Sequence, residues 1–133
     1  MRRVIVTATT SCGLRGGHID LTSQRARNAV GGTDDDPALT AQRVKAAVDA
    51  RLSGVLCAPQ ELEALRKNVP PGFQLVAAGI RLPNEEVYKD DQERVASPEQ
   101  ADRWGADLLV VGRPILHARE PRKALARLFP KAP

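Results

Sequence analysis

The stretch GADLLVVGRPI, residues 105–115, is the clearest indication of the fold. Its middle, DLLVV at 107–111, is a near-continuous apolar run with the length of a strand. Strands of a parallel sheet have this composition because both of their faces are buried. The run ends in Gly112-Arg113-Pro114, and glycine and proline interrupt regular structure. We therefore predict a buried strand that ends in a turn bearing an arginine.

Three further runs have the same character. They are VIVTA at residues 4–8, GVLCA at 54–58 and FQLVAA at 73–78. No stretch alternates apolar and polar residues in the way that a hairpin would. The sequence therefore predicts four buried strands that run parallel to one another.

Helical segments separate the strands. Residues 37–52 place their apolar side chains close to one helix face, and residues 59–67 begin with a proline that suits a first helical turn. SPEQ at 97–100 has the spacing of a capping box, and Glu120-Pro121 opens a last helix. Strand and helix thus alternate four times. Because a whole barrel takes about 250 residues, we predict an α/β fold that is the parallel-stranded (β/α)4 half of a TIM (β/α)8 barrel; a different small α/β fold is the alternative.

The domain organisation that we expect is simple. Residues 1–133 form a single partial barrel domain, and residues 37–133 hold its core βα units. Residues 13–36 are polar, with paired glycines and a run of three aspartates, so we expect a poorly ordered or irregular insertion there.

Composition narrows the functional classes. The net charge of +4 is concentrated in residues 113–133 and has no interleaved aromatic residues, which does not favour nucleic-acid binding. No apolar run reaches the length of a membrane span and no leader begins the chain, so a soluble, cytoplasmic protein without membrane contact is expected. The spacing of Cys12 and Cys57 favours neither a disulfide nor a redox motif, and His18 and His117 do not have the spacing of a metal site.

Two glycine-arginine turns carry the functional prediction. Gly79 and Arg81 follow the third strand, and Gly112 and Arg113 follow the fourth. In barrels of this type a phosphate often lies between the loops after the last two strands. Glycine lets a backbone N–H approach the phosphate, and a guanidinium can donate two charge-assisted hydrogen bonds. One such turn alone would more simply be an ordinary strand end, but two on consecutive strands predict an anion site, over which a polar loop around Gln92 could close.

Four segments resemble the orotidine 5'-phosphate decarboxylase family. The similarity covers about residues 52–129, and VTATTS at 6–11 resembles the end of that family's fifth strand. The chain would then hold strands five to eight. The segments arrive in one order along the chain: GVLCAPQE at 54–61, LVAAGIR at 75–81, DDQERVASPEQA at 90–101 and GADLLVVGRPI at 105–115.

The resemblance implies a set of binding residues. It assigns Arg81, Gln92, Gly112 and Arg113 to the phosphate of a nucleotide, either orotidine or uridine 5'-phosphate, and Thr10 to the pyrimidine. A hydroxyl that only caps a strand end is an equally good interpretation of Thr10. The resemblance also implies chemistry without a cofactor, so no cofactor is expected, and no metal-binding residue is assigned.

The resemblance also implies an activity whose catalytic residues this sequence lacks. The family converts orotidine 5'-phosphate to uridine 5'-phosphate and CO2 in pyrimidine biosynthesis, with a lysine and aspartates spaced D-x-K-x-x-D. None of the five lysines has that spacing, so no catalytic residue is assigned and the chain is expected to be inactive alone. Two departures concern the substrate loop: Ala78 stands where the family commonly has proline, and residues 82–91 are slightly lengthened.

Two alternatives remain. The chain could belong to another phosphate-binding barrel such as a sugar-phosphate decarboxylase. It could be a non-catalytic assembly module or relic. Because an open half-barrel leaves unpaired strand edges, either a homodimer or a separate N-terminal half is the expected partner.

Overall fold

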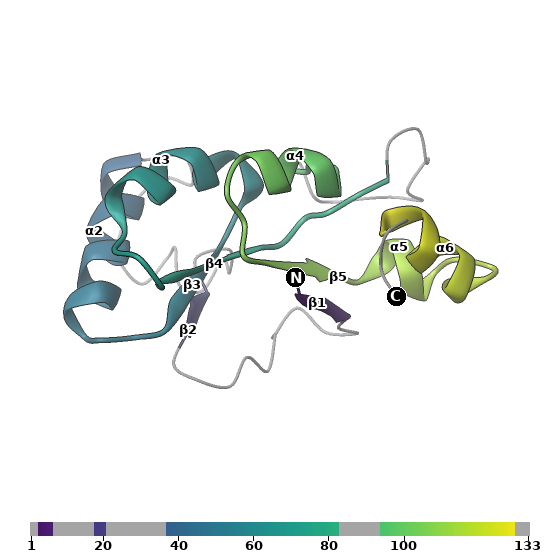
Figure 1. Cartoon of the computed structure of the whole chain (residues 1–133), viewed down its shortest axis with the longest axis horizontal. Coiled ribbons are helices and arrows are strands. Elements are labelled where there is room, and N and C mark those ends of the chain that lie inside the picture. The colour runs from purple at the N-terminus through teal and green to yellow at the C-terminus, as the bar shows by residue number, and fades with distance from the viewer. Residues whose placement is uncertain (1–2, 7–17, 21–36, 83–93, 130–133) are drawn as a thin grey trace.

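The structure, a computed structural model, describes residues 3–6, 18–20, 37–82 and 94–129. Within these residues five parallel strands form a single sheet in the order β1-β5-β4-β3-β2 (Figure 1). The strands are β1 (Arg3–Val6), β2 (His18–Asp20), β3 (Gly54–Cys57), β4 (Gln74–Ala77) and β5 (Leu108–Val111).

Helices connect the strands and cover the sheet. In Figure 1, α2, α3 and α4 lie on one side of β3, β4 and β5, while α5 and α6 lie at the end toward which β5 runs. Their bounds are α2 (Pro37–Asp49), the 3-10 turn η1 (Pro59–Glu61), α3 (Leu62–Asn68), α4 (Pro98–Arg103), α5 (Arg113–Leu116) and α6 (Pro121–Leu128). None of the helices in the described part of the chain has the length and apolar character that a membrane span requires.

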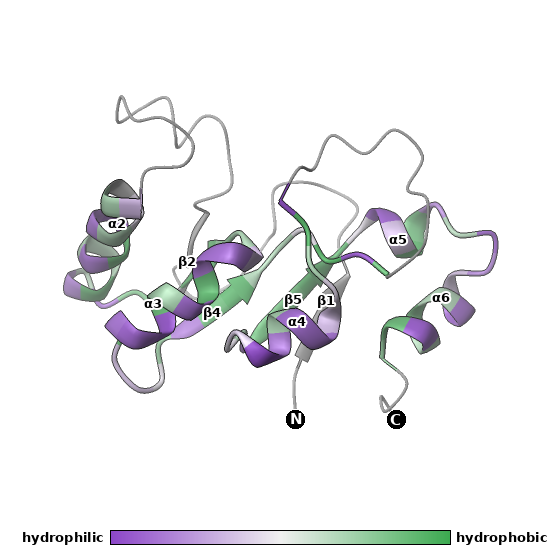
Figure 2. Ribbon diagram, turned by 90° about the horizontal axis from the view of Figure 1, so that it is seen from above, coloured by the Kyte–Doolittle hydropathy of each residue, from purple (hydrophilic) through white to green (hydrophobic). Residues whose placement is uncertain are grey.

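Successive side chains of each strand point to opposite faces of the sheet, so the buried residues of the strands form two clusters. One face packs against α2, α3 and α4 through alternate strand residues, which are Val55, Cys57, Leu75, Ala77, Leu109 and Val111. The residues between them form a second buried cluster of Leu56, Val76, Leu108 and Val110. Figure 2 shows the resulting contrast between hydrophobic strands and helices that carry hydrophilic residues. Burial on both faces explains why these strands are apolar throughout.

Most local predictions are confirmed. Each of the four predicted runs overlaps a strand. The predicted helix over 37–52 is α2 and ends at Asp49, the one predicted over 59–67 is the turn η1 followed by α3, and the last helix begins at Pro121 as predicted. The capping box is present: Ser97 Oγ accepts a hydrogen bond from the Gln100 amide at 3.2 Å, and Gln100 Oε1 accepts one from the Ser97 amide at 2.9 Å.

The edges of the sheet differ from the prediction. A strand at the fifth barrel position would pair with β3, but β1 pairs with β5 on the other side of the sheet, and β2 lies beside β3. β2 is a strand that the sequence analysis did not predict, inside the segment 13–36 that was expected to be irregular. The physical reason is that an open sheet has two unpaired edges and a short β-branched run can hydrogen-bond to either. Four residues of β1 align with four of β5.

Gly54 opens β3 where two strands approach closely. It is paired with Gln74 on β4, and a Cβ at this position would lie 2.2 Å from the backbone oxygen of Gln74. Real Cβ atoms do not approach a carbonyl oxygen so closely, so glycine is required by space rather than by backbone conformation.

Candidate functional site

The two predicted glycine-arginine turns follow neighbouring strands. β4 and β5 pair in parallel, with Val76 opposite Leu108 and Ala77 opposite Leu109. Both strands therefore end at the same edge of the sheet, and in Figure 1 the chain leaves both of them toward the end where α5 lies. Ligands of open and closed α/β sheets bind at this carboxyl edge.

The turn after β4 is held by backbone hydrogen bonds. Gly79 has a φ of 78°, in the left-handed region that favours glycine. The Arg81 amide donates to the Ala96 carbonyl at 2.9 Å, and the Ala96 amide donates to the Gly79 carbonyl at 3.1 Å. Ile80, between them, is fully buried. The backbone that carries Arg81 is thus fixed to a segment that lies fifteen positions further along the chain.

The turn after β5 begins a short helix. Gly112 is the N-cap of α5, and its carbonyl accepts hydrogen bonds from the amides of Ile115 at 2.9 Å and Leu116 at 3.0 Å. Arg113 is half-buried at this position. The sequence analysis did not predict α5.

The remaining predicted site residues cannot be placed. Gln92 and Thr10 lie outside the described residues. Of the predicted set, the structure therefore brings Arg81, Gly112 and Arg113 to the ends of adjacent strands. Their common binding of a phosphate stays a prediction.

Sequence reasoning missed an ion pair beside the first turn. Arg94 Nη1 lies 3.1 Å from Glu61 Oε1, and both side chains are mostly buried. Glu61 Oε2 also accepts a hydrogen bond from the Ala58 amide at 3.0 Å. Glu61 ends the segment GVLCAPQE at 54–61, and Arg94 lies in DDQERVASPEQA at 90–101. Because 33 positions separate the two residues, no local sequence pattern reveals their contact.

A cavity of about 860 Å³ lies between α2 and α3. Neither Arg81 nor the Gly112-Arg113 pair lines it. Its wall is mainly apolar and consists of Pro37, Thr40, Ala41, Val44, Lys45, Val48, Gln60, Glu61, Ala64, Leu65, Asn68 and Arg94.

The described cysteine is unsuited to nucleophilic chemistry. Cys57 is fully buried, and its thiol points to the Val76 carbonyl at 3.7 Å. Burial raises the pKa of the Cys57 thiol far above its ordinary value, and the nearby charge of Glu61 raises it further. The reactive thiolate is therefore disfavoured. In the part of the chain that the structure describes, no group of three or more His, Cys, Asp or Glu side chains is placed to hold a metal ion.

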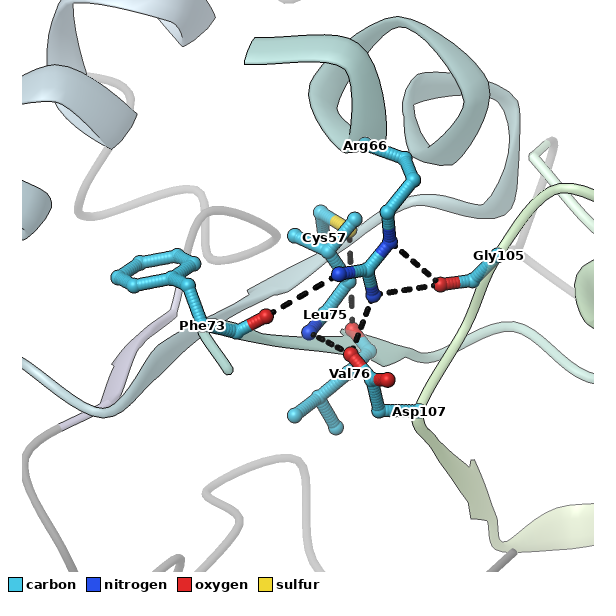
Figure 3. A network of polar contacts seen from close by, with 7 residues as sticks. All are labelled: Cys57, Arg66, Phe73, Leu75, Val76, Gly105 and Asp107. Carbon is cyan, nitrogen blue, oxygen red and sulfur yellow. Dashed lines mark hydrogen bonds and ion pairs between the residues drawn. The ribbon is translucent and has the colours of Figure 1, made fainter. Parts of the chain in front are cut away.

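A second polar cluster lies at the opposite, amino ends of the strands (Figure 3). Arg66 of α3 donates to the Gly105 carbonyl through Nε at 3.1 Å and Nη2 at 2.7 Å, and to the Phe73 carbonyl through Nη1 at 3.2 Å. It also forms an ion pair with Asp107, whose carboxylate accepts a hydrogen bond from the Leu75 amide at 2.8 Å. Polar residues at this end of a barrel serve stability rather than catalysis.

Comparison with known proteins identifies the family. Residues 19–128 match the family described as Orotidine 5'-phosphate decarboxylase / HUMPS family, and the chain belongs to it. The fold is accordingly that of a partial TIM barrel.

Individual relatives agree with this assignment. The chain is 51% identical over 76 residues to an orotidine 5'-phosphate decarboxylase of Actinobacillus succinogenes, covering 57% of this chain and 32% of the relative. It is 46% identical over 77 residues to an orotidine 5'-phosphate decarboxylase of Streptococcus pyogenes, covering 58% and 33%. The matched part thus spans about a third of these curated relatives.

Solved structures show the same architecture over more of the chain. Orotidine 5'-phosphate decarboxylase from Lactobacillus acidophilus superposes with a TM-score of 0.60 at 26% identity, covering 97% of this chain and 48% of that one. The enzyme from Pyrococcus horikoshii superposes with a TM-score of 0.58 at 19% identity, covering 96% and 49%, which shows the fold alone. This chain therefore spans about half of the solved relatives.

Proposed function

We propose that this chain supplies the phosphate-binding part of an orotidine 5'-phosphate decarboxylase, the enzyme that forms uridine 5'-phosphate and CO2. One observation carries the proposal: two glycine-arginine turns follow adjacent parallel strands in a member of this family. A nucleotide monophosphate has a dianionic phosphate, which guanidinium groups and backbone amides bind well.

The chain alone is proposed to bind the nucleotide without decarboxylating it. Loss of CO2 leaves an electron pair on the pyrimidine ring, which must be stabilised and then protonated. The lysine and aspartates spaced D-x-K-x-x-D that the resemblance assigns to these tasks are not in this sequence. We propose that another polypeptide segment, called the complement below, supplies the lysine and the aspartates.

The complement is proposed to join the sheet at its edges. β1 and β2 are the outer strands of the five-stranded sheet, and an outer parallel strand has unpaired backbone groups. Either the other half of a barrel or a second copy of this chain would satisfy them. Sedimentation at several concentrations distinguishes a homodimer from a monomer that needs another partner.

Calorimetric titration tests the binding proposal. We expect uridine 5'-phosphate to bind at least tenfold more tightly than uridine, because about 1.4 kcal/mol from one charge-assisted contact suffices for that ratio. Arg113→Ala should remove most of the preference. Arg119→Ala, an exposed arginine of the same basic region, is the matched control and should leave it unchanged.

Three results would count against the proposal. Equal affinity for the nucleoside and the nucleotide would exclude a phosphate site. Equal losses of affinity in Arg113→Ala and Arg119→Ala would show that the nucleotide is attracted by the overall positive charge and not bound at a phosphate site. Tighter binding of ribose 5-phosphate than of uridine 5'-phosphate would shift the substrate class to sugar phosphates.

A further inference from the structure

Three chain segments meet at a junction beside the first predicted phosphate turn. The segment after β3 contributes Gln60 and Glu61, and the segment that precedes α4 contributes residues 94–96. Arg94 is paired with Glu61 at 3.1 Å, and Gln60 Nε2 donates to the Val95 carbonyl at 3.0 Å. Two consecutive residues of one segment therefore hold two consecutive residues of the other.

The segment 94–96 also binds the third segment, the turn at residues 79–81. Directly after Val95, Ala96 accepts a hydrogen bond from the Arg81 amide at 2.9 Å and donates one to the Gly79 carbonyl at 3.1 Å. These bonds make a parallel bridge between Ile80 and Ala96. A continuous path of contacts thus leads from Glu61, through residues 94–96, to the backbone of Arg81.

Glu61 is suited to anchor this path. Its side chain is 20% exposed and that of Arg94 is 27% exposed, so solvent screens the pair less than it screens a surface ion pair. Its second carboxylate oxygen is bonded to the Ala58 amide at 3.0 Å, which fixes the side chain to the end of β3. A carboxylate with both oxygens engaged holds Arg94 in one place.

We propose that Glu61 is a positioning residue for phosphate binding: through Arg94 it fixes the segment that sets the backbone of Arg81. The inference rests on the proposed function for the role of Arg81. Its geometric part does not, because every contact in the path joins described residues of the fold. Glu61 itself contacts no phosphate in this proposal.

Glu61→Gln is the decisive variant. It retains an oxygen for the Ala58 amide but removes the charge that attracts Arg94. Glu63→Gln is the matched control, because Glu63 lies on the adjoining helix and its ion pair with Lys67, at 3.7 Å, joins two exposed side chains. Arg94→Gln tests the same link from the other side and serves if Glu61→Gln does not fold.

Two measurements separate positioning from general destabilisation. Hydrogen exchange should become about tenfold faster at the amides of Arg81 and Ala96 in Glu61→Gln, while the Leu109 amide in β5 keeps its rate. Affinity for uridine 5'-phosphate should fall about threefold to tenfold, with the affinity for uridine unchanged. Glu63→Gln should leave both measurements as they are in the unmodified chain.

The outcomes distinguish this inference from the proposed function. Unchanged exchange at Arg81 in Glu61→Gln and Arg94→Gln overturns the inference, whatever the nucleotide does. Faster exchange with unchanged affinity for uridine 5'-phosphate overturns the role in phosphate binding. If the unmodified chain binds no uridine 5'-phosphate, the proposed function fails and the phosphate role with it, while the exchange rates still decide whether Glu61 fixes the turn.

Discussion

Replacing Arg66 with methionine should destabilise the fold by about 3 kcal/mol. Methionine preserves an unbranched apolar stem but removes every donor of the guanidinium. The change therefore isolates the polar contacts that connect α3 to the amino ends of β4 and β5.

The magnitude follows from the individual contacts. Arg66 makes three hydrogen bonds to the carbonyls of Gly105 and Phe73, and such bonds contribute about 0.5–1.5 kcal/mol each. The ion pair with Asp107 adds less than about 1 kcal/mol, since the two side chains are 33% and 42% exposed and solvent screens them. Because the two bonds to Gly105 share one acceptor, the total is nearer to about 3 kcal/mol than to the sum of the maxima.

Urea denaturation followed by circular dichroism measures the loss. Asp107→Asn is the comparison, because it keeps an oxygen for the Leu75 amide and loses only the charge; it should cost about 1 kcal/mol or less. A loss below about 1 kcal/mol in Arg66→Met would refute the estimate from the carbonyl contacts. A larger loss in Asp107→Asn than in Arg66→Met would show that the carboxylate, and not the arginine, organises the cluster.

Three further predictions concern the free energy of unfolding. Gly54→Ala should cost at least about 2 kcal/mol in urea denaturation, because the new Cβ would lie 2.2 Å from the Gln74 oxygen; a neutral change would show that the strands separate freely. Ser97→Ala should lower the free energy of unfolding by about 1 kcal/mol through loss of the bond from the Gln100 amide, and a threonine at the same position should recover most of it. Stability should fall by about 1.4 kcal/mol between pH 8 and pH 10, because the folded state keeps the Cys57 thiol protonated beyond its ordinary pKa of 9.0 and the unfolded chain releases the proton. Cys57→Ala should remove that part of the pH dependence, and a slope that persists in this variant would assign it to another group.

Local features of the fold were predictable from the sequence. The run at 107–111 is apolar because β5 is buried on both faces, and the capping box at 97–100 is a pattern within four residues. Each of these signals depends on neighbours along the chain, which a single sequence displays directly.

Contacts between distant segments were not predictable. The Glu61–Arg94 pair spans 33 positions and the bond from Arg66 to Gly105 spans 39. An arginine that binds the protein's own carbonyls and one that would bind a phosphate look alike in a sequence. The glycine-arginine turns stood out because two of them end consecutive strands, whereas Arg66 lies in an ordinary helical stretch.

The pairing at the sheet edges also joins distant segments and was not predictable from the sequence. It determines how the complement proposed above could close a barrel. In a closed barrel the last strand pairs with the first, so β1 occupies the edge of β5 that a first barrel strand would take. A complement that closes the barrel must therefore displace β1 or extend the sheet beyond it. Displacement exchanges one short parallel ladder for another, which leaves the number of backbone hydrogen bonds nearly unchanged. The free energy of displacing β1 then depends on the apolar area that the complement buries against the second cluster. This cluster, on the side of the sheet away from α2, α3 and α4, consists of Leu56, Val76, Leu108 and Val110.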